Sequence, residues 1–368
     1  MRNCMRLGLD VGSTTVKVVI LDENDRIVYT DYKRHYAETQ KHTIELLRDA
    51  YNHIGNQPFT AMVTGSAGLS ISSWLGVEHI QEVIACNTAI GRYIPHIDVA
   101  IELGGEDAKI TFFQDGPDQR MNGICAGGTG AFIDQMATLL GTDVNGLNQL
   151  ARRATAIYSV AARCGVFAKT DIQVLLNEGA KKEDIAASVF QAVVNQTVSG
   201  LACGKSITGN VAFLGGPLSF LSELRRRFQE TLQLDDKEAV FPPYSQFFVA
   251  LGAALASQSS PMIRLASLIK RLEKIDLSDY QQFTHLKPLF ESQEDYTRFR
   301  ARHQQNKVPR RDLDTYGGDC YLGIDAGSTT TKAALIDASG RLLYSCYTNN
   351  TGSPLDSALK ILRDLASC

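Results

Sequence analysis

The sequence predicts an α/β protein with mixed sheets, on three observations. Short apolar segments with strand character end in polar or glycine-containing turns, and segments with apolar residues at helical spacing alternate with them. With 44% hydrophobic and 21% charged residues among 368, the chain can bury a sizeable core. A segment near the N-terminus also recurs near the other end of the sequence. We therefore expect more than one folding unit.

The expected elements follow one another in the α/β order. Apolar patterning predicts strands at 7–12, 15–21, 26–34, 61–64, 99–103, 108–113 and 210–214. Helical spacing predicts helices at about 44–54, 80–94, 129–140, 168–178, 184–203 and 219–232, and a small-residue helix at 249–257. Together these elements predict one α/β domain over residues 1–258.

The region that follows has a different character. One helical stripe begins at Ile263 and continues through Leu268 and Leu272, and Ser292-x-x-Asp295 is a capping-box pattern that starts a second helix. We expect residues 259–318 to be a helical connector without chemistry of its own.

An internal repeat covers the two ends of the sequence. The segment 7–17, LGLDVGSTTVK, recurs as LGIDAGSTTTK at 322–332, and the same offset joins Asp22 to Asp337 and Tyr29 to Tyr344. The second copy matches only the opening part of the first. We expect residues 319–368 to be the first strands of a second, truncated repeat.

Charge and hydropathy exclude some classes of function. The formal net charge is −3, and phosphate-backbone binding needs concentrated positive potential, so nucleic acid is not expected as a partner. The longest apolar run, 247–256, is too short to cross a bilayer, and no signal segment opens the chain. We expect a cytoplasmic protein without a membrane partner. Its eight cysteines include no Cys-x-x-Cys pair, which disfavours a zinc ribbon.

Two acid-plus-glycine turns between strands predict a phosphate site. In the first, Asp10 ends a strand and is followed by Gly12, Ser13, Thr14 and Thr15, whose backbone N–H and hydroxyl groups can bind phosphate oxygens. Asp10 is expected to hold Mg²⁺ through water. Lys17, two residues after the turn, either neutralises phosphate charge or points to solvent.

The second turn has the same plan and a third glycine element follows later. Glu102 ends a strand and precedes Gly104, Gly105, Glu106 and Asp107. Two such turns facing one another are what a metal–nucleotide clamp between two lobes needs. A Gly-Gly turn before a helix suits close approach of an adenosine, and it is formed by Gly215, Gly216 and Pro217.

Two cysteines stand in glycine-containing segments just before predicted helices. Cys125 is followed by Gly128, Thr129 and Gly130, and Cys164 precedes the helix expected near 168–178. A helix N-terminus favours a thiolate, which suits an iron–sulfur cluster, although a small buried cysteine is the plainer interpretation. Two cysteines are half of a [4Fe–4S] ligand set, which a symmetric homodimer would complete.

In this order the motifs resemble phosphate 1, phosphate 2 and the adenosine motif of a two-lobed ATPase fold with ribonuclease H-like lobes. Sugar kinases, actin and heat-shock chaperones share that fold. The resemblance implies that residues 87–91 and 252–256 belong to small-residue helices that cross between the lobes. Over residues 5–257, including the segments around Cys125 and Cys164, the sequence is similar to the activases (component A) of 2-hydroxyacyl-CoA dehydratases, of the BadF/BadG/BcrA/BcrD-type ATPase family. With its second hairpin it resembles the large members that carry two activase units. The family has Asp-Ile-Gly-Gly-Gln-Asp where this chain has Glu102-Leu-Gly-Gly-Glu106-Asp.

The resemblance implies an ATP-dependent reductive activator. A [4Fe–4S] cluster on Cys125 and Cys164, shared across a homodimer or paired activase units, would take an electron from a ferredoxin or flavodoxin. Mg²⁺–ATP hydrolysis to ADP would drive it into an iron–sulfur dehydratase or a benzoyl-CoA reductase-like partner. Asp10 and Glu102 would hold Mg²⁺ through water, and Glu106 or Asp107 would orient the attacking water. The expected ATP contacts are Gly12, Ser13, Thr14, Thr15, Lys17, Gly104, Gly105, Gly128, Thr129, Gly130, Gly215, Gly216 and Pro217.

Two other functions remain open. An N-acetylhexosamine-type sugar kinase shares the fold but needs a catalytic aspartate, for which Asp107 is the best candidate. A nucleotide-switched binding module would have no redox chemistry, and its cysteines would be incidental.

Overall fold

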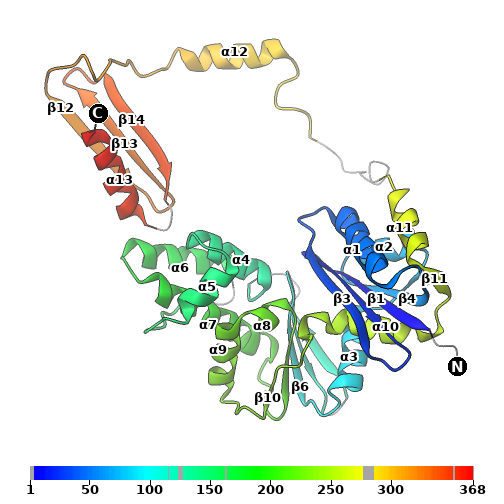
Figure 1. The fold of residues 1–368 in the computed structure, drawn as a ribbon. Coiled ribbons are helices and arrows are strands. Elements are labelled where there is room, and N and C mark those ends of the chain that lie inside the picture. The colour runs from blue at the N-terminus through cyan, green and yellow to red at the C-terminus, as the bar shows by residue number, and fades with distance from the viewer. Residues whose placement is uncertain are drawn as a thin grey trace. The chain divides into compact units, whose positions relative to one another are not determined.

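The computed structural model describes residues 4–114, 116–122, 127–161, 164–276, 286–350 and 353–367. The chain forms two units (Figure 1). The first comprises Met1–Thr138, Thr142–Asp171 and Lys182–Ile275, and the second comprises Leu139–Gly141, Ile172–Lys181 and Asp276–Cys368. The first unit thus runs to Ile275, past residue 258, where the sequence pattern placed the end of the first domain.

The first lobe of the first unit is built on the sheet with strand order β11-β4-β1-β2-β3, and β5 pairs with β4. Its strands are β1 (Met5–Val11), β2 (Thr15–Leu21), β3 (Ile27–Arg34), β4 (Pro58–Thr64), β5 (Glu78–His79) and β11 (Met262–Arg264). The helices that pack on it are α1 (Thr39–Ile54), α2 (Gly68–Leu75) and α11 (Leu265–Glu273). β1 and β2 are almost wholly buried, because apolar side chains on both faces meet a helix layer.

The second lobe repeats this plan. Its sheet has the order β10-β9-β6-β7-β8, with β6 to β8 antiparallel and β9 parallel to β6, just as β4 is parallel to β1. The strands are β6 (Val99–Leu103), β7 (Ala108–Phe112), β8 (Asp118–Met121), β9 (Val211–Leu214) and β10 (Ala239–Val240). The helices are α4 (Gly130–Leu139), α5 (Val144–Ala151), α6 (Gly165–Asn177), α7 (Lys182–Leu201), α8 (Gly216–Phe220) and α9 (Ser222–Leu232).

Two helices, α3 (Glu82–Tyr93) and α10 (Phe248–Ala256), cross between the sheets (Figure 1). A Cβ added at Gly252 would overlap the carbonyl oxygen of Ala85, so only glycine permits this crossing. The two crossing helices contain residues 87–91 and 252–256, as the resemblance implies, and the closest approach on α3 lies at Ala85, since a Cβ at Gly91 would meet nothing within 4 Å. On its other side α10 packs so closely on β1 that a Cβ at Gly8 would overlap the carbonyl oxygen of Ala250.

The apolar stripe of α11 explains why the first unit extends to Ile275. Leu265, Leu268 and Leu272 are buried in the core of the first lobe, and β11 pairs with β4. A short helix with one apolar face needs a surface to cover it, and the sheet edge and α1 supply that surface.

The second unit contains the repeated segment. From residue 286 onward its elements are α12 (Gln293–Gln304), β12 (Cys320–Ala326), β13 (Thr330–Asp337), β14 (Leu342–Asn349) and α13 (Pro354–Ala366), and the sheet order is β12-β13-β14. The capping-box prediction is confirmed, because the Ser292 hydroxyl accepts a hydrogen bond from the Asp295 amide at 3.2 Å. Within the described ranges, no helix is both long and apolar enough to span a membrane.

Candidate functional site

The first acid-plus-glycine turn joins β1 to β2. Asp10 and Lys17 are direct partners in the antiparallel register, and Lys17 Nζ lies 2.7 Å from the Asp10 carboxylate. The Lys17 side chain is only 15% exposed and the Asp10 side chain only 5%, so the alternative in which Lys17 points to solvent is wrong. The Gly12 amide closes the turn on the Thr15 carbonyl at 2.9 Å.

The environment of Lys17 fixes its charge. Burial alone would lower the pKa of Lys17, but the adjacent Asp10 carboxylate, with Tyr32 and Glu102 farther away, outweighs this and raises the pKa above its ordinary value. The cleft therefore has a permanent cation beside a carboxylate, which suits binding of a phosphate together with its metal ion.

The second turn joins β6 to β7 and is organised by Lys109. The Gly104 amide donates to the Asp107 carbonyl at 2.8 Å, and Lys109 Nζ lies 2.7 Å from Asp107 and 3.8 Å from Glu102. Lys109 also pairs with Glu82, the first residue of α3. Burial would lower the pKa of Lys109, but the three carboxylates raise it.

The charge of Glu102 is only partly compensated by the lysines near it. Burial, and then the nearby carboxylates Asp107 and Glu82, raise its pKa, against the opposing effect of Lys109 and Lys17. Glu102 also lines the cleft, and a divalent cation bound there through water would favour its ionised form.

The two turns face one another across a cleft between the lobes. Gly105 lies against Thr14, so closely that a Cβ at Gly105 would overlap the Thr14 hydroxyl. A third turn sits beside them: Gly215 has φ of 91°, and a Cβ there would overlap the Leu103 carbonyl. Backbone approach this close is what glycine allows at a ligand cradle.

Most of the predicted residues are brought together in this cleft. Those that line it are Thr14, Thr15, Lys17, Glu102, Gly104, Gly105, Gly130, Gly215, Gly216 and Pro217. The other residues predicted for the nucleotide site are described but are not in its lining, namely Asp10, Gly12, Ser13, Glu106, Asp107, Gly128 and Thr129. Lining residues that the sequence did not point to include Tyr32, Arg34, Asp134, Phe220, Ser245 and Gln246.

The predicted residues outside the lining have other contacts. Asp10 is paired with Lys17, Glu106 is exposed, and Asp107 is paired with Lys109. Gly128 has φ of 84° and packs against Gln196 of α7, while Thr129 is fully buried. These two residues therefore position the start of α4.

The start of α4 rests directly on the second turn. The Gly130 amide donates to the Gly104 carbonyl at 3.0 Å, and the Ala131 amide donates to the Gly105 carbonyl at 2.7 Å. A displacement of the second turn must therefore displace α4. In the first turns of α4, Asp134 pairs with Arg34 of β3 at 2.9 Å, which links this helix to the first lobe.

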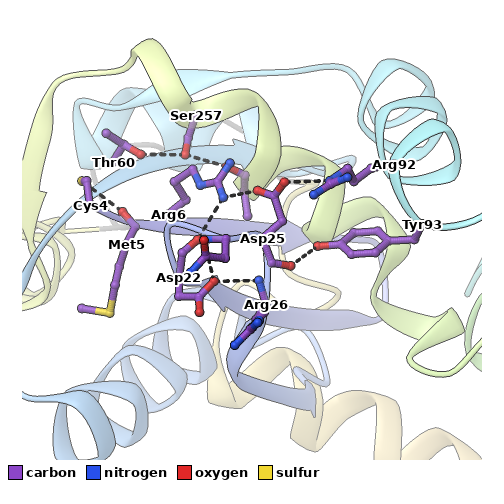
Figure 2. Close-up of polar contacts among 12 residues, drawn as sticks. Cys4, Met5, Arg6, Asp22, Asp25, Arg26, Thr60, Arg92, Tyr93 and Ser257 are labelled. Atoms are coloured by element: carbon purple, nitrogen blue, oxygen red, sulfur yellow. Dashed lines mark hydrogen bonds and ion pairs between the residues drawn. The ribbon is translucent and has the colours of Figure 1, made fainter. Parts of the chain in front are cut away.

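Helix α3 connects the second turn to the far end of the first lobe. At its last turn, Arg92 Nε donates to the Asp25 carboxylate at 2.7 Å and the Tyr93 hydroxyl donates to the Asp25 carbonyl at 2.8 Å. Figure 2 shows that Asp25 also pairs with Arg6 of β1. The sequence pattern did not single out Glu82 or Asp25; their only signals are an acidic helix start and a polar turn.

The described cysteines include one of the two predicted cluster ligands. Cys164 is half-buried and precedes α6, and its carbonyl accepts the Ala168 amide at 2.9 Å. Val166 and Phe167 beside it are 73% and 66% exposed. Cys125 lies outside the described residues. Among the residues that the structure describes, no group of three or more His, Cys, Asp or Glu side chains could hold a metal ion.

Cys86 is buried on α3. Burial raises its pKa well above the ordinary value, and the neighbouring Glu102 adds to the effect. The thiol is therefore protonated at neutral pH.

The two α/β lobes share one topology, and their glycine turns and carboxylates meet at the cleft between them. This arrangement defines a two-lobed ATPase of the predicted fold. The chain belongs to the BadF/BadG/BcrA/BcrD ATPase family, whose model matches residues 7–257. The (R)-2-hydroxyglutaryl-CoA dehydratase activating ATPase of Acidaminococcus fermentans is 30% identical over 255 residues, which are 68% of this chain and 95% of that protein.

Two solved structures have the same architecture. Component A of the Acidaminococcus fermentans (R)-2-hydroxyglutaryl-CoA dehydratase aligns with a TM-score of 0.61 and 26% identity, over 74% of this chain and all of that one. The activator of the 2-hydroxyisocaproyl-CoA dehydratase from Clostridium difficile, with bound ADPNP, has a TM-score of 0.61 and 25% identity, over 78% of this chain and all of that one.

Proposed function

We propose that this protein is an ATP-driven reductive activator: hydrolysis of Mg²⁺–ATP in the cleft drives an electron from a [4Fe–4S] cluster into a partner dehydratase or reductase. The activating ATPases to which it is similar support the partner class. A ferredoxin or flavodoxin is the proposed electron donor, and the proposed acceptor is an iron–sulfur enzyme that acts on an acyl-CoA.

The nucleotide would lie between the three turns. Backbone N–H groups and the hydroxyls of Thr14 and Thr15 would bind phosphate oxygens, with Lys17 neutralising part of their charge. Asp10 and Glu102 would hold Mg²⁺ through water. Glu106 is the better candidate to orient the attacking water, because Asp107 is engaged by Lys109 at 2.7 Å.

One observation carries the coupling of hydrolysis to electron transfer. The first amides of α4 donate to the carbonyls of Gly104 and Gly105, which belong to the turn that would contact the terminal phosphate. Cys125 lies five residues before Gly130, where α4 begins. A change at the phosphate would therefore reach the start of α4, which follows a proposed cluster ligand in the sequence, and in this way a nucleotide can bias two conformations.

The surroundings of Cys164 support a shared cluster. This half-buried cysteine stands at a helix start next to the exposed apolar side chains of Val166 and Phe167. Exposed apolar side chains beside a ligand are better explained by a covering surface than by solvent. We propose that a second copy of the chain supplies both the cover and the other two thiolates.

The experiment is an oxygen-free purification with iron and acid-labile sulfide analysis and visible spectroscopy. About four irons per two chains are expected for the wild type. Cys125→Ser and Cys164→Ser are expected to lose the iron and the colour, whereas the exposed Cys203→Ser, the matched control, keeps both.

ATP hydrolysis is measured on the same samples. Both cluster variants are expected to retain Mg²⁺-dependent ATPase activity, because the cleft residues are untouched. A colourless, iron-free wild type that phosphorylates a hexosamine would end the activator proposal in favour of the kinase. Binding of ATP without iron, hydrolysis or phosphotransfer would favour the nucleotide-switched module.

A further inference from the structure

A row of four side chains crosses the first sheet at the cleft. The register pairs Thr64 of β4 with Asp10 of β1, Asp10 with Lys17 of β2, and Lys17 with Tyr32 of β3. Side chains in register on neighbouring strands project from the same face. Lys17 and Tyr32 line the cleft, so Asp10 and Thr64 continue the same row on that face.

Thr64 is the member of this row with an unexplained polar atom. The residue is fully buried, and its hydroxyl oxygen has no hydrogen-bond partner among the residues that the structure describes. A buried hydroxyl without a partner is costly, and such groups concentrate where a ligand or a bound water completes them. Valine has nearly the same shape and would occupy this position without that cost.

The chemistry of the row indicates what the hydroxyl would bind. The Asp10 carboxylate only accepts hydrogen bonds and the Lys17 ammonium only donates, whereas a threonine hydroxyl does both. Lys17 already occupies one side of Asp10 at 2.7 Å, and Thr64 stands on the other side. A water molecule bound to a metal ion needs acceptors for its two hydrogens, and Asp10 and Thr64 together offer them.

We propose that Thr64 is a further residue of the nucleotide site: its hydroxyl, together with Asp10, holds a water of the Mg²⁺ shell. It is a positioning residue, because it acts on the metal through that water. The inference rests on the proposed function, in which Mg²⁺ enters the cleft with ATP or ADP.

The test compares Thr64→Val and Thr64→Ser with wild type by titration of fluorescent ADP, in MgCl₂ and in EDTA. Thr64→Val is expected to weaken binding about three- to tenfold in MgCl₂ and to leave binding in EDTA unchanged. Thr64→Ser, which keeps the hydroxyl, is expected to restore most of the Mg²⁺-dependent affinity.

The same strand offers a matched control. Thr60 is also buried on β4, but its hydroxyl lies 2.9 Å from the Ser257 hydroxyl (Figure 2). Thr60→Val is expected to lower the melting temperature of the unliganded protein by about 2–4 °C without changing Mg²⁺–ADP binding. Thr64→Val is expected to leave that temperature unchanged or raise it, because no partner is lost.

The outcomes separate this inference from the proposed function. If wild type binds ADP with the same affinity in MgCl₂ and EDTA, the proposed metal–nucleotide site fails, and the role of Thr64 fails with it. If wild type depends on Mg²⁺ but Thr64→Val binds Mg²⁺–ADP equally well, only the role of Thr64 is overturned. Equal losses in MgCl₂ and EDTA would overturn it too, since the hydroxyl would then not act through the metal.

Discussion

The two glycine-containing hairpins, β1–β2 and β12–β13, have nearly the same local geometry in different surroundings. Lys17 lies 2.7 Å from Asp10, and Lys332 lies 2.7 Å from Asp325. The Gly12 amide donates to the Thr15 carbonyl at 2.9 Å, and the Gly327 amide donates to the Thr330 carbonyl at 3.0 Å. An identical turn sequence therefore builds the same hairpin twice.

The support behind each turn is also reproduced, with different side chains. His35 is 3.0 Å from the Gly12 carbonyl, and the Asn350 amide donates to the Gly327 carbonyl at 2.8 Å. The backbone amide of His35 also donates to the Thr14 carbonyl, and that of Asn350 donates to the Thr329 carbonyl. In both hairpins the turn is thus supported by the residue that follows the third strand.

Burial is where the hairpins differ. Asp10 and Lys17 are 5% and 15% exposed, while Asp325 and Lys332 are 66% and 42% exposed. Every residue of β12 is exposed, whereas β1 is buried between a helix layer and α10. The electrostatic strength of the first site therefore comes from tertiary packing, because an ion pair in water is weak.

The second hairpin also lacks the residues that anchor the first to α3. Tyr321 stands at the position of Arg6 and Gly340 at that of Asp25. It keeps the residues of the phosphate turn, Asp325 to Lys332, without this anchor. We propose that residues 319–368 are an activase-like repeat element, with residues 276–318 as the segment that connects it to the ATPase unit.

The largest difference in stability between the hairpins is expected when one methyl group is added at the equivalent glycine of the first strand of each. Gly8→Ala places a Cβ inside the Ala250 carbonyl and is expected to destabilise the first unit by more than about 4 kcal/mol. Gly323→Ala, its matched control, meets nothing closer than the Ala334 carbonyl at 4.0 Å and should be neutral or slightly stabilising.

Hydrogen exchange with mass spectrometry checks this, because it reads the two hairpins as separate peptides. Rapid exchange throughout the first unit of Gly8→Ala, with the second hairpin unchanged, is the expected result. A well-protected first unit in Gly8→Ala would mean that α10 does not pack on β1 as the structure has it.

The next difference concerns the two lysines. Lys17→Met leaves the Asp10 carboxylate buried without its cation and is expected to cost about 3 kcal/mol, whereas Lys332→Met should change stability too little to resolve. The pKa of Lys17 is raised in the folded state, so its contribution is full below about pH 10 and is lost only as the pH rises through the folded pKa.

Urea denaturation of wild type and Lys17→Met between pH 7 and about pH 10 measures this contribution. The difference between them should stay constant over that range. An equal loss of stability in Lys17→Met and Lys332→Met would contradict the role assigned to burial.

These contrasts also show what the sequence could and could not predict. The turns, the strands around them and the capping box at Ser292 depend on local chemistry, so residue patterns predicted them. The crossing at Ala85 could not be predicted, because it depends on which helix faces meet. Glu82 was missed for the same reason: nothing in its own segment indicates that Lys109, on another strand, is its partner.

The smallest expected effect concerns the anchor that the second hairpin lacks. Asp25→Asn keeps a residue that tolerates the positive φ of 64° but removes the charge that pairs with Arg6 and Arg92. A loss of about 1 kcal/mol is expected at neutral pH, since Arg92 is largely exposed and Arg6 keeps its bond to the Asp22 carbonyl.

The pH dependence identifies the cause of that loss. Burial would raise the pKa of Asp25, but hydrogen bonds and charges from Arg6 and Arg92 outweigh it and lower the pKa. The stabilisation is therefore complete above the unfolded pKa of about 4 and disappears as the pH falls through the folded value. The free energies of unfolding of wild type and Asp25→Asn, measured by urea denaturation, should converge below about pH 4. Gly340→Asn places asparagine at the corresponding position of the second hairpin, and its free energy of unfolding should show no such convergence with that of wild type. A difference between wild type and Asp25→Asn that persists undiminished in acid would mean that the turn, and not the charge on Asp25, anchors α3.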